Sequence, residues 1–201
     1  MRIAVDAMGG DRAPEAAIDG ALTALQEFSS ELEILLVGQK EVLEPLLDQK
    51  GAQALKKAIV HAPSVIGMDE HPTKAVAAKQ DSSIMTGFGM LKKGIADAFC
   101  SAGNTGAMLV GSMFTIKAVE GIIRPAIASL FPKSSERYGV VIDVGANADC
   151  KPDVLAQFAL MGSLFSQHVM KVDNPKVGLM NIGEEETKGT LLTQAAYPLL
   201  K

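Results

Sequence analysis

This sequence has few cysteines and histidines and no tryptophan, and the scarcity of cysteine and histidine argues against some kinds of structural and metal site. Its 201 residues include 2 cysteines, 3 histidines and no tryptophan. Cys100 and Cys150 are too few for a disulfide framework and lack metal-ligand spacing. The histidines are scattered, which favours structural roles. We therefore expect no metal site and no cofactor.

Long apolar runs and basic runs are also missing. The longest apolar stretch, residues 107–116, stops at Lys117, far short of the roughly 20 residues that span a bilayer. A net charge of −4 and a pI near 5.4 give no electrostatic footprint for nucleic acid. Residues 1–5 run directly into a strand-like pattern, so we expect no signal peptide. The sequence thus predicts a cytoplasmic protein that does not bind nucleic acid.

Short apolar runs alternate with helical patterns along almost the whole chain. The apolar runs predict strands at residues 2–7, 31–37, 58–61, 97–100, 126–131, 138–144 and 176–180. The 3.6-residue periodicity predicts helices at residues 14–28, 41–48, 73–80, 82–93, 104–119, 152–170 and 190–200. This alternation predicts an α/β fold, a three-layer αβα sandwich with a mainly parallel sheet. We expect one domain over residues 1–201.

The stretch Ser101-Ala-Gly-Asn-Thr-Gly-Ala107 lies between a predicted strand and a predicted helix. Its glycines allow close backbone approach, and a helix N-terminus favours anions. Asn104 and Thr105 suit the cap and first turn of the helix. The stretch is not a Walker A loop, because Ser112-Met113 stands where Lys-Ser/Thr is required. A looser phosphate or carboxylate site and a plain strand–helix turn both remain open.

Cys100, at the end of the strand before this turn, allows two interpretations. A helix N-terminus lowers a thiol pKa, which would suit a nucleophile. A small buried hydrophobe at a strand end is the commoner role of such a cysteine. We favour the second interpretation.

The loop of residues 6–11 places Asp6 and Asp11 around Gly9-Gly10. It is either a ligand loop or a strand–helix turn in which Asp11 caps the helix. The G-x-G-x-x-G pattern of dinucleotide-binding proteins is absent from it.

Two later loops are also polar. Residues 143–152 carry Asp143, Asn147, Asp149 and a lysine, and oxygen ligands for a metal are conceivable there, but no histidine accompanies them. In residues 181–189, Lys188 precedes a glycine at a predicted helix start. That loop is either a solvated surface or a phosphate contact. From the residues alone, the chain is an α/β protein with an anion-binding rim and no assigned reaction.

Four motifs together resemble one family, the PlsX family of bacterial phosphate acyltransferases of fatty acid and phospholipid synthesis. They are residues 1–11, 101–106, 143–147 and 183–189, in the same order along the whole chain. Family members are about half as long again, so the resemblance implies that this sequence lacks the C-terminal part of the family fold. One departure is visible: Arg12 stands where the family commonly has histidine, so no acid–base role is assigned to position 12.

The resemblance implies an enzyme that moves a long acyl chain from acyl carrier protein to inorganic phosphate, giving an acyl phosphate. It implies a fold similar to isocitrate and isopropylmalate dehydrogenases and to phosphate acetyltransferases. It further implies a homodimer and peripheral membrane association. An enzyme that uses coenzyme A thioesters, as phosphate acetyltransferases do, and a non-catalytic anion-binding module are the alternatives.

The resemblance and the motifs together give a candidate site. Lys188 aligns with a lysine that the family uses in catalysis, and Asn104 or Asn147 would stabilise the thioester oxyanion. Phosphate and substrate binding is assigned to Asp6, Gly9, Gly10, Asp11, Ser101, Gly103, Thr105, Gly106, Asp143 and Gly145. Carrier-protein docking is assigned to a face with Lys74, Lys79, Lys92 and Lys93, which are equally explained as solvated helix residues.

Overall fold

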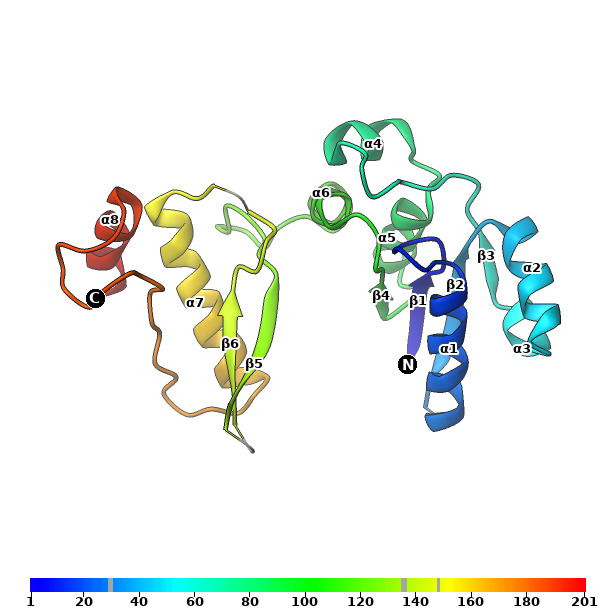
Figure 1. Cartoon of the computed structure of the whole chain (residues 1–201), viewed down its shortest axis with the longest axis horizontal. Helices are drawn as coiled ribbons and strands as arrows, with labels where there is room; N and C mark the ends of the chain where they lie inside the picture. Colours follow the sequence, from blue (N-terminus) through cyan, green and yellow to red (C-terminus); the bar gives the residue numbers. More distant parts are fainter. Residues whose placement is uncertain (29–30, 135–136, 148) are drawn as a thin grey trace. The chain divides into compact units, whose positions relative to one another are not determined.

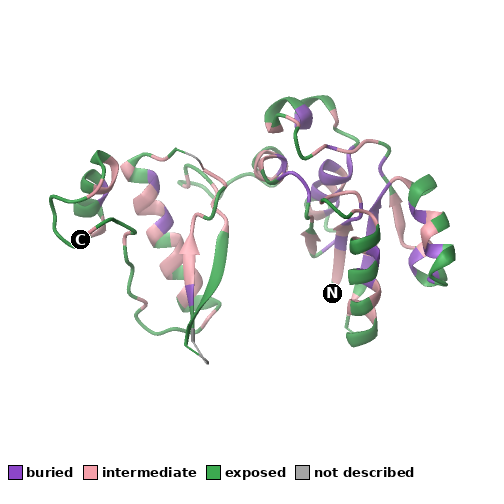
Figure 2. Ribbon diagram, viewed as in Figure 1, coloured by how far each residue is buried: buried purple, intermediate pink, exposed green. Residues whose placement is uncertain are grey.

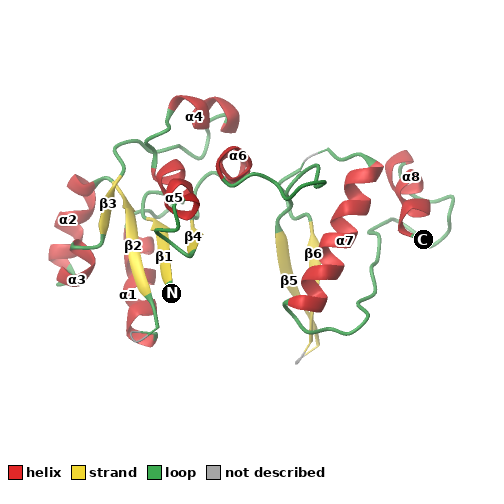
Figure 3. Ribbon diagram, turned by 180° about the vertical axis from the view of Figure 1, so that it is seen from behind, coloured by secondary structure: helices red, strands yellow, loops and turns green. Residues whose placement is uncertain are grey.

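Four short strands in the first half of the chain pair side by side, all parallel. They are β1 (Arg2–Asp6), β2 (Glu33–Gly38), β3 (Ile59–His61) and β4 (Ala98–Cys100). Their order in the sheet is β3-β2-β1-β4 (Figure 3). In the register, Ile3 of β1 lies opposite Ile34 of β2 and Ala98 of β4. The predicted mainly parallel sheet is confirmed.

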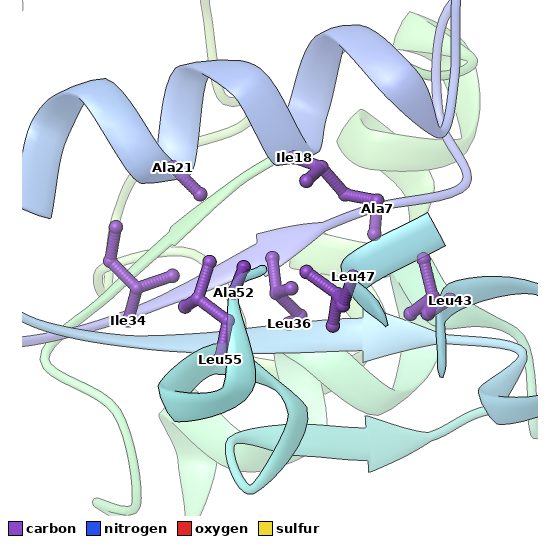
Figure 4. Close-up of a cluster of buried hydrophobic side chains, with 9 residues drawn as sticks. All are labelled: Ala7, Ile18, Ala21, Ile34, Leu36, Leu43, Leu47, Ala52 and Leu55. Atoms are coloured by element: carbon purple, nitrogen blue, oxygen red, sulfur yellow. The ribbon is translucent and has the colours of Figure 1, made fainter. Parts of the chain in front are cut away.

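Helices cover both faces of this sheet because both faces of its strands are apolar. Alternate residues of β2 point to opposite sides. Ile34 and Leu36 pack with α1 (Glu15–Glu27), α2 (Lys40–Gln49) and α3 (Gln53–Lys56), and Figure 4 shows these side chains pointing toward one another. Val37 packs on the other face with Met90 of α5 (Ser83–Lys92). The result is three layers, helix–sheet–helix, with buried apolar side chains on both faces of the sheet.

Two further helices pack beside α5. They are α4 (Pro72–Ala78) and α6 (Thr105–Thr115). Val76 of α4, Phe88 of α5 and Ala107 of α6 belong to one buried cluster. Phe88 also meets Phe99 of β4 edge to face, with 5.2 Å between ring centroids, a geometry that aromatic quadrupoles favour. This cluster fixes the start of α6 against the sheet.

The second half of the chain has a smaller core. A ribbon of β5 (Ala128–Ser134) and β6 (Arg137–Ile142) is antiparallel, and it is followed by α7 (Pro152–His168) and α8 (Leu191–Leu200). Val154 and Phe158 of α7 and Ala196 of α8 are buried. The strand β5 is exposed along its whole length, green in Figure 2.

The chain divides into two compact units, Met1–Lys117 (unit 1) and Ala118–Lys201 (unit 2), seen in Figure 1. The structure, a computed structural model, describes residues 1–28, 31–134, 137–147 and 149–201. The single-domain expectation stays a prediction. Across the described residues, no helix is both long and apolar enough to cross a membrane.

Two sequence predictions about these elements are wrong, and one short helix was missed. Residues 176–180 form no strand, and they pair with none of the described strands. The helix α6 ends at Thr115 rather than near residue 119, because Lys117 takes a left-handed conformation (φ 72°) and its N–H bonds back to Ser112 O. The helix α3 was not predicted. Between the strands predicted at residues 126–131 and 138–144, the sequence also predicts a polar loop or hairpin tip at residues 134–137, and residues 135 and 136 of it lie outside the described residues.

Candidate functional site

The loops after β1 and β4 lie side by side because these strands are neighbours in the sheet. After β1, the chain forms β2 and β3 on one side of β1, and β4 then pairs with the other side of β1. The carboxyl ends of β1 and β4 therefore flank the point where the strand order reverses, where open α/β sheets usually bind ligands. The predicted site residues of unit 1 lie in these two loops and at the start of α6.

Asp6 joins the two loops through its carboxylate, which is only 2% exposed. Its Oδ1 accepts from the Met8 N–H (3.0 Å), and its Oδ2 accepts from Ser101 Oγ (2.6 Å). The Gly103 N–H in turn donates to Ser101 Oγ (3.0 Å). Both carboxylate oxygens are thus used to hold backbone and hydroxyl groups in place, as a buried charge requires.

The glycines of the two loops are in direct contact. A Cβ on Gly9 would lie 2.7 Å from the N of Gly103 and 2.9 Å from its Cα, closer than real Cβ contacts. Gly10 has φ +105° and faces Ala102. At Gly9, then, the packing of loop on loop leaves no room for a side chain, and at Gly103 an added Cβ would be tightly packed, 3.3 Å from the Cα of Gly9.

Asn104 caps α6 and also binds the loop before α4. It is 5% exposed, and its Oδ1 accepts from the Ala107 N–H (3.0 Å). Its Nδ2 donates toward the carbonyls of Gly67 (3.0 Å), Met68 (3.3 Å) and Glu70 (3.0 Å). The predicted cap is confirmed, and the amide hydrogens are directed at loop carbonyls. Its role toward an oxyanion stays a prediction.

The first turn of α6 presents backbone donors. Thr105 is the first helical residue and is exposed. The next residue, Gly106, packs against Pro72, and a Cβ on Gly106 would be in steric conflict with the Cγ of Pro72. The N–H groups of a first helical turn have no acceptor within the helix. Together with the helix dipole they make this end of α6 favourable for an anion.

The structure contradicts one expectation for Asp11 and one for Cys100. Asp11 is exposed, and the N-cap of α1 is Pro14, without a side-chain cap, so the interpretation of Asp11 as a cap is wrong. Cys100 is exposed at the end of β4. The expectation that it is buried is wrong because the strand ends at this residue.

In unit 2, Asp143 organises the loop after β6. Its Oδ1 accepts from the N–H groups of Ile127 (3.1 Å) and Ala146 (3.2 Å). Its Oδ2 accepts from the backbone N–H (2.6 Å) and Nδ2 (3.0 Å) of Asn147. Burial raises the pKa of Asp143, but these donated hydrogen bonds together outweigh it and hold the pKa below its ordinary value.

Asn147 and Gly145 shape the same loop. The Nδ2 of Asn147 donates to Asp143 and also to the Pro125 carbonyl (3.0 Å). Gly145 has φ +99°, which explains glycine there. Burial raises the pKa of the nearby Cys150 thiol.

Lys188 lies in an exposed loop that other side chains hold. Asn181 Nδ2 donates to the Lys188 carbonyl (3.2 Å), and Gln194 Nε2 donates to the Thr187 carbonyl (2.9 Å). Gly189 (φ +93°) approaches Asn181 and Thr193 so closely that a Cβ would not fit. The side chain of Lys188 is exposed.

Thus unit 1 brings together Asp6, Gly9, Gly10, Ser101, Gly103 and Asn104. Unit 2 holds Asp143, Gly145 and Asn147 in one loop and Lys188 in another. Sequence reasoning missed residues 67–70, because no periodic or spacing signal connects them to Asn104. Among the described residues, no three His, Cys, Asp or Glu side chains gather as a metal-binding group.

Comparison with known proteins gives the family. A profile of the family described as "Fatty acid synthesis protein" matches residues 1–201, and the chain belongs to this family. Proteins named phosphate acyltransferase from Desulfitobacterium hafniense (strain Y51) and Salinibacter ruber are 48% and 49% identical over 201 residues. All of this chain is covered, but only 59% of each relative.

A solved structure shares the fold. The crystal structure of a phosphotransacetylase from Streptococcus pyogenes matches 86% of this chain and 55% of its own, with a TM-score of 0.63 and 20% identity. At that identity the likeness supports the α/β fold and nothing finer.

Proposed function

We propose that the full-length protein transfers a long-chain acyl group from acyl carrier protein to inorganic phosphate and releases an acyl phosphate. The observation that carries the proposal is the paired turn at the carboxyl ends of β1 and β4 in a chain of this family. The relatives named phosphate acyltransferase support the acyl transfer to phosphate. The carrier protein and the product come from the sequence resemblance.

The reaction needs orientation more than a strong base. Near neutral pH, phosphate is already largely a dianion, and one of its oxygens attacks the thioester carbonyl. A C–O bond forms, the C–S bond breaks, and the carrier-protein sulfur leaves as a thiolate that takes up the proton given up by the hydrogen phosphate. Holding the two reactants in line supplies up to about 7–11 kcal/mol of the barrier. No covalent intermediate with the protein is required, which agrees with leaving Cys100 and Cys150 without a role.

The start of α6 is the proposed phosphate-binding element. The amides of residues 104–106 and the helix dipole favour an anion there, while the Gly103 N–H is already donated to Ser101 Oγ. The Asp6–Ser101 hydrogen bond (2.6 Å) holds the turn in the binding conformation. Asp6 thus acts on phosphate through the turn, since its own negative charge would repel the ligand.

Lys188 is the proposed catalytic lysine. Its ammonium is exposed, and the loop backbone around it is held by Asn181 and Gln194. A positive charge of this kind stabilises phosphate oxygens by charge-assisted hydrogen bonds.

The sequence also predicts Asn104 or Asn147 as the donor to the thioester oxyanion, a type of contact typically worth about 10²–10³ in rate. Either amide would first have to release a partner that it already holds, because Nδ2 of Asn104 donates to loop carbonyls and Nδ2 of Asn147 donates to Asp143 and to the Pro125 carbonyl.

Assembly and location remain proposals too. The family resemblance supports a homodimer in the cytoplasm that associates peripherally with the membrane.

The test measures the release of free thiol from long-chain acyl carrier protein, with and without phosphate. It uses the 201-residue chain, the full-length protein, and two full-length variants. Lys188→Ala should lower phosphate-dependent turnover about 10²-fold or more. Lys176→Ala, which removes another exposed lysine of unit 2, is the matched control and should leave turnover unchanged.

The outcomes separate the alternatives. Phosphate-dependent release by the wild type supports the proposal, and full activity of Lys188→Ala would remove that residue from it. Equal use of coenzyme A thioesters would favour an enzyme of the phosphate acetyltransferase type. Tight phosphate binding without turnover would select a non-catalytic binding module.

A further inference from the structure

We propose that the ion pair between Glu70 and Lys79 positions the anion-binding turn of residues 101–106. Both residues are positioning residues, since neither is part of the turn. That the turn binds phosphate rests on the proposed function. How the turn is held rests on the hydrogen bonds of unit 1 alone.

The ion pair closes the loop of residues 65–70 on itself. Glu70 Oε1 accepts from Lys79 Nζ (2.5 Å) and from the Gly67 N–H (2.6 Å). Lys79 Nζ also donates to the Val65 carbonyl (2.7 Å), and the Glu70 N–H donates to the Gly67 carbonyl (3.3 Å). Each side chain of the pair is 33% exposed, so the pair is better shielded than a typical surface ion pair.

The closed loop presents its carbonyls to one side chain. Those of Gly67, Met68 and Glu70 converge on Nδ2 of Asn104, at 3.0 to 3.3 Å. The other end of the same amide caps α6 through the Ala107 N–H. One buried asparagine therefore transmits the position of the loop to the first turn of the helix.

A second contact, between Pro72 and Gly106, also holds the first turn of α6 in place. Pro72, the first residue of α4, follows the loop directly and packs against Gly106 in the first turn of α6. The loop is fixed at one end by Lys79, the residue that ends α4, and at the other by Asn104. Loosening the ion pair would release both contacts on α6 together.

Position and charge make opposite predictions for Glu70→Gln and the same prediction for Lys79→Met, so Glu70→Gln is the variant that separates them. Glu70→Gln leaves an unpaired ammonium, and a pure charge effect would then tighten phosphate binding. Lys79→Met leaves an unpaired carboxylate, and a pure charge effect would weaken it. A positioning role predicts that both substitutions weaken phosphate binding.

The experiment uses full-length protein and steady-state kinetics with phosphate and long-chain acyl carrier protein. We expect Glu70→Gln and Lys79→Met each to raise KM for phosphate about threefold to tenfold. We expect KM for the carrier protein to change less than twofold. Asp19→Asn breaks another ion pair of unit 1, between Asp19 and Lys50 (2.6 Å), and should change neither constant. A lower KM for phosphate in Glu70→Gln would overturn the proposal.

Hydrogen exchange gives a readout that does not depend on activity. The amide of Ala107 is protected by Asn104, so exchange of the 104–108 segment should accelerate in both pair variants and stay unchanged in Asp19→Asn. If the wild type shows no phosphate-dependent release but exchange accelerates, the proposed function fails while the positioning role stands. Unchanged exchange in both variants would refute the positioning role.

Discussion

Gly9 shows how one missing side chain lets two loops meet. An alanine Cβ at this position would lie within 3 Å of Asp6 Oδ2 and of the Gly103 backbone. Backbone atoms cannot move away without shifting the Asp6–Ser101 hydrogen bond. We predict that Gly9→Ala lowers the free energy of unfolding by about 1–3 kcal/mol, measured by chemical denaturation of the full-length protein.

The matched control for that substitution is Gly20→Ala. Gly20 lies in the middle of α1 with no atom within 4 Å of an added Cβ. Alanine is the better helix former, so this variant should be more stable by about 0.5–1 kcal/mol. Equal effects of the two substitutions would contradict the assigned loop contact.

Asp143 makes a pH-dependent contribution to the stability of unit 2. Its pKa is lowered in the folded state, because donated hydrogen bonds outweigh the effect of burial. A carboxyl with a lowered folded pKa stabilises the fold above its unfolded pKa, near 3.8, and this stabilisation is lost as the pH falls through the folded pKa.

We therefore predict that Asp143→Asn costs about 1–2 kcal/mol at pH 7. The difference from wild type should shrink steadily below about pH 4. Denaturation midpoints across this range measure it. Asp173→Asn, an exposed aspartate of the same unit, is the control, and a pH-independent difference at position 143 would argue against the carboxylate's role.

At the scale of the elements, α2 contains a proline that a helix interior ordinarily rejects. Pro45 lies within Lys40–Gln49, exposed, and the helix continues through it. The burial of Leu43 and Leu47 compensates for the backbone hydrogen bond that proline cannot donate.

Replacing Pro45 with alanine should stabilise α2 by about 1–3 kcal/mol. Hydrogen exchange of residues 40–50 should slow accordingly. Pro152→Ala is the control, because proline at the first position of α7 costs nothing. Faster exchange of α2 in Pro45→Ala would show that the ring itself contributes to packing.

The elements that the sequence predicts well are those with a local signal. The apolar residues 2–7 form the strand β1, and the helix α6 begins directly after its cap at Asn104, both as predicted. Residues 176–180 have the composition of a strand but form none. A strand exists only where a neighbouring strand pairs with it, and a local sequence pattern does not show which segments will pair. The helix α3 is a single turn, too short for a periodic signal.

In the candidate site, too, some features could be predicted from a local sequence pattern and others could not. The loops after β1 and β4 were predictable, because the carboxyl ends of neighbouring parallel strands share an edge. Contacts between residues 67–70 and Asn104 cross more than 30 positions of sequence and follow from tertiary packing alone. That these two loops of unit 1 lie at one edge of the sheet was predictable from sequence, whereas how the groups of the candidate site are held was not.

At the scale of the whole molecule, the lysines proposed for docking belong to different ends of the sheet. Lys74 is exposed on α4, whose first residue packs against α6 at the carboxyl edge. Lys92 and Lys93 end α5, next to Ile95, whose carbonyl binds Arg2 at the amino end of β1. Lys79 is already paired with Glu70.

If an acidic carrier protein docks beside the 101–106 turn, Lys74→Glu should raise KM for acyl carrier protein about threefold or more, and more strongly at low salt. The double substitution Lys92→Glu with Lys93→Glu should have little effect, and it serves as the control. Steady-state kinetics at two ionic strengths measure both. The reverse order of effects would move docking to the amino end of the sheet.

The order of strands in unit 1 also has a consequence for synthesis on the ribosome. The strand β1 pairs with β4 across Val5 and Cys100, so one edge of β1 stays open until the chain has been made past residue 100. At about 5–20 residues per second, that interval lasts about 5–20 seconds. During that time the apolar residues of β1 expose a pairing edge of the kind that promotes association between chains. The neighbour that completes the candidate site is therefore also the segment that ends this vulnerable period of the nascent protein.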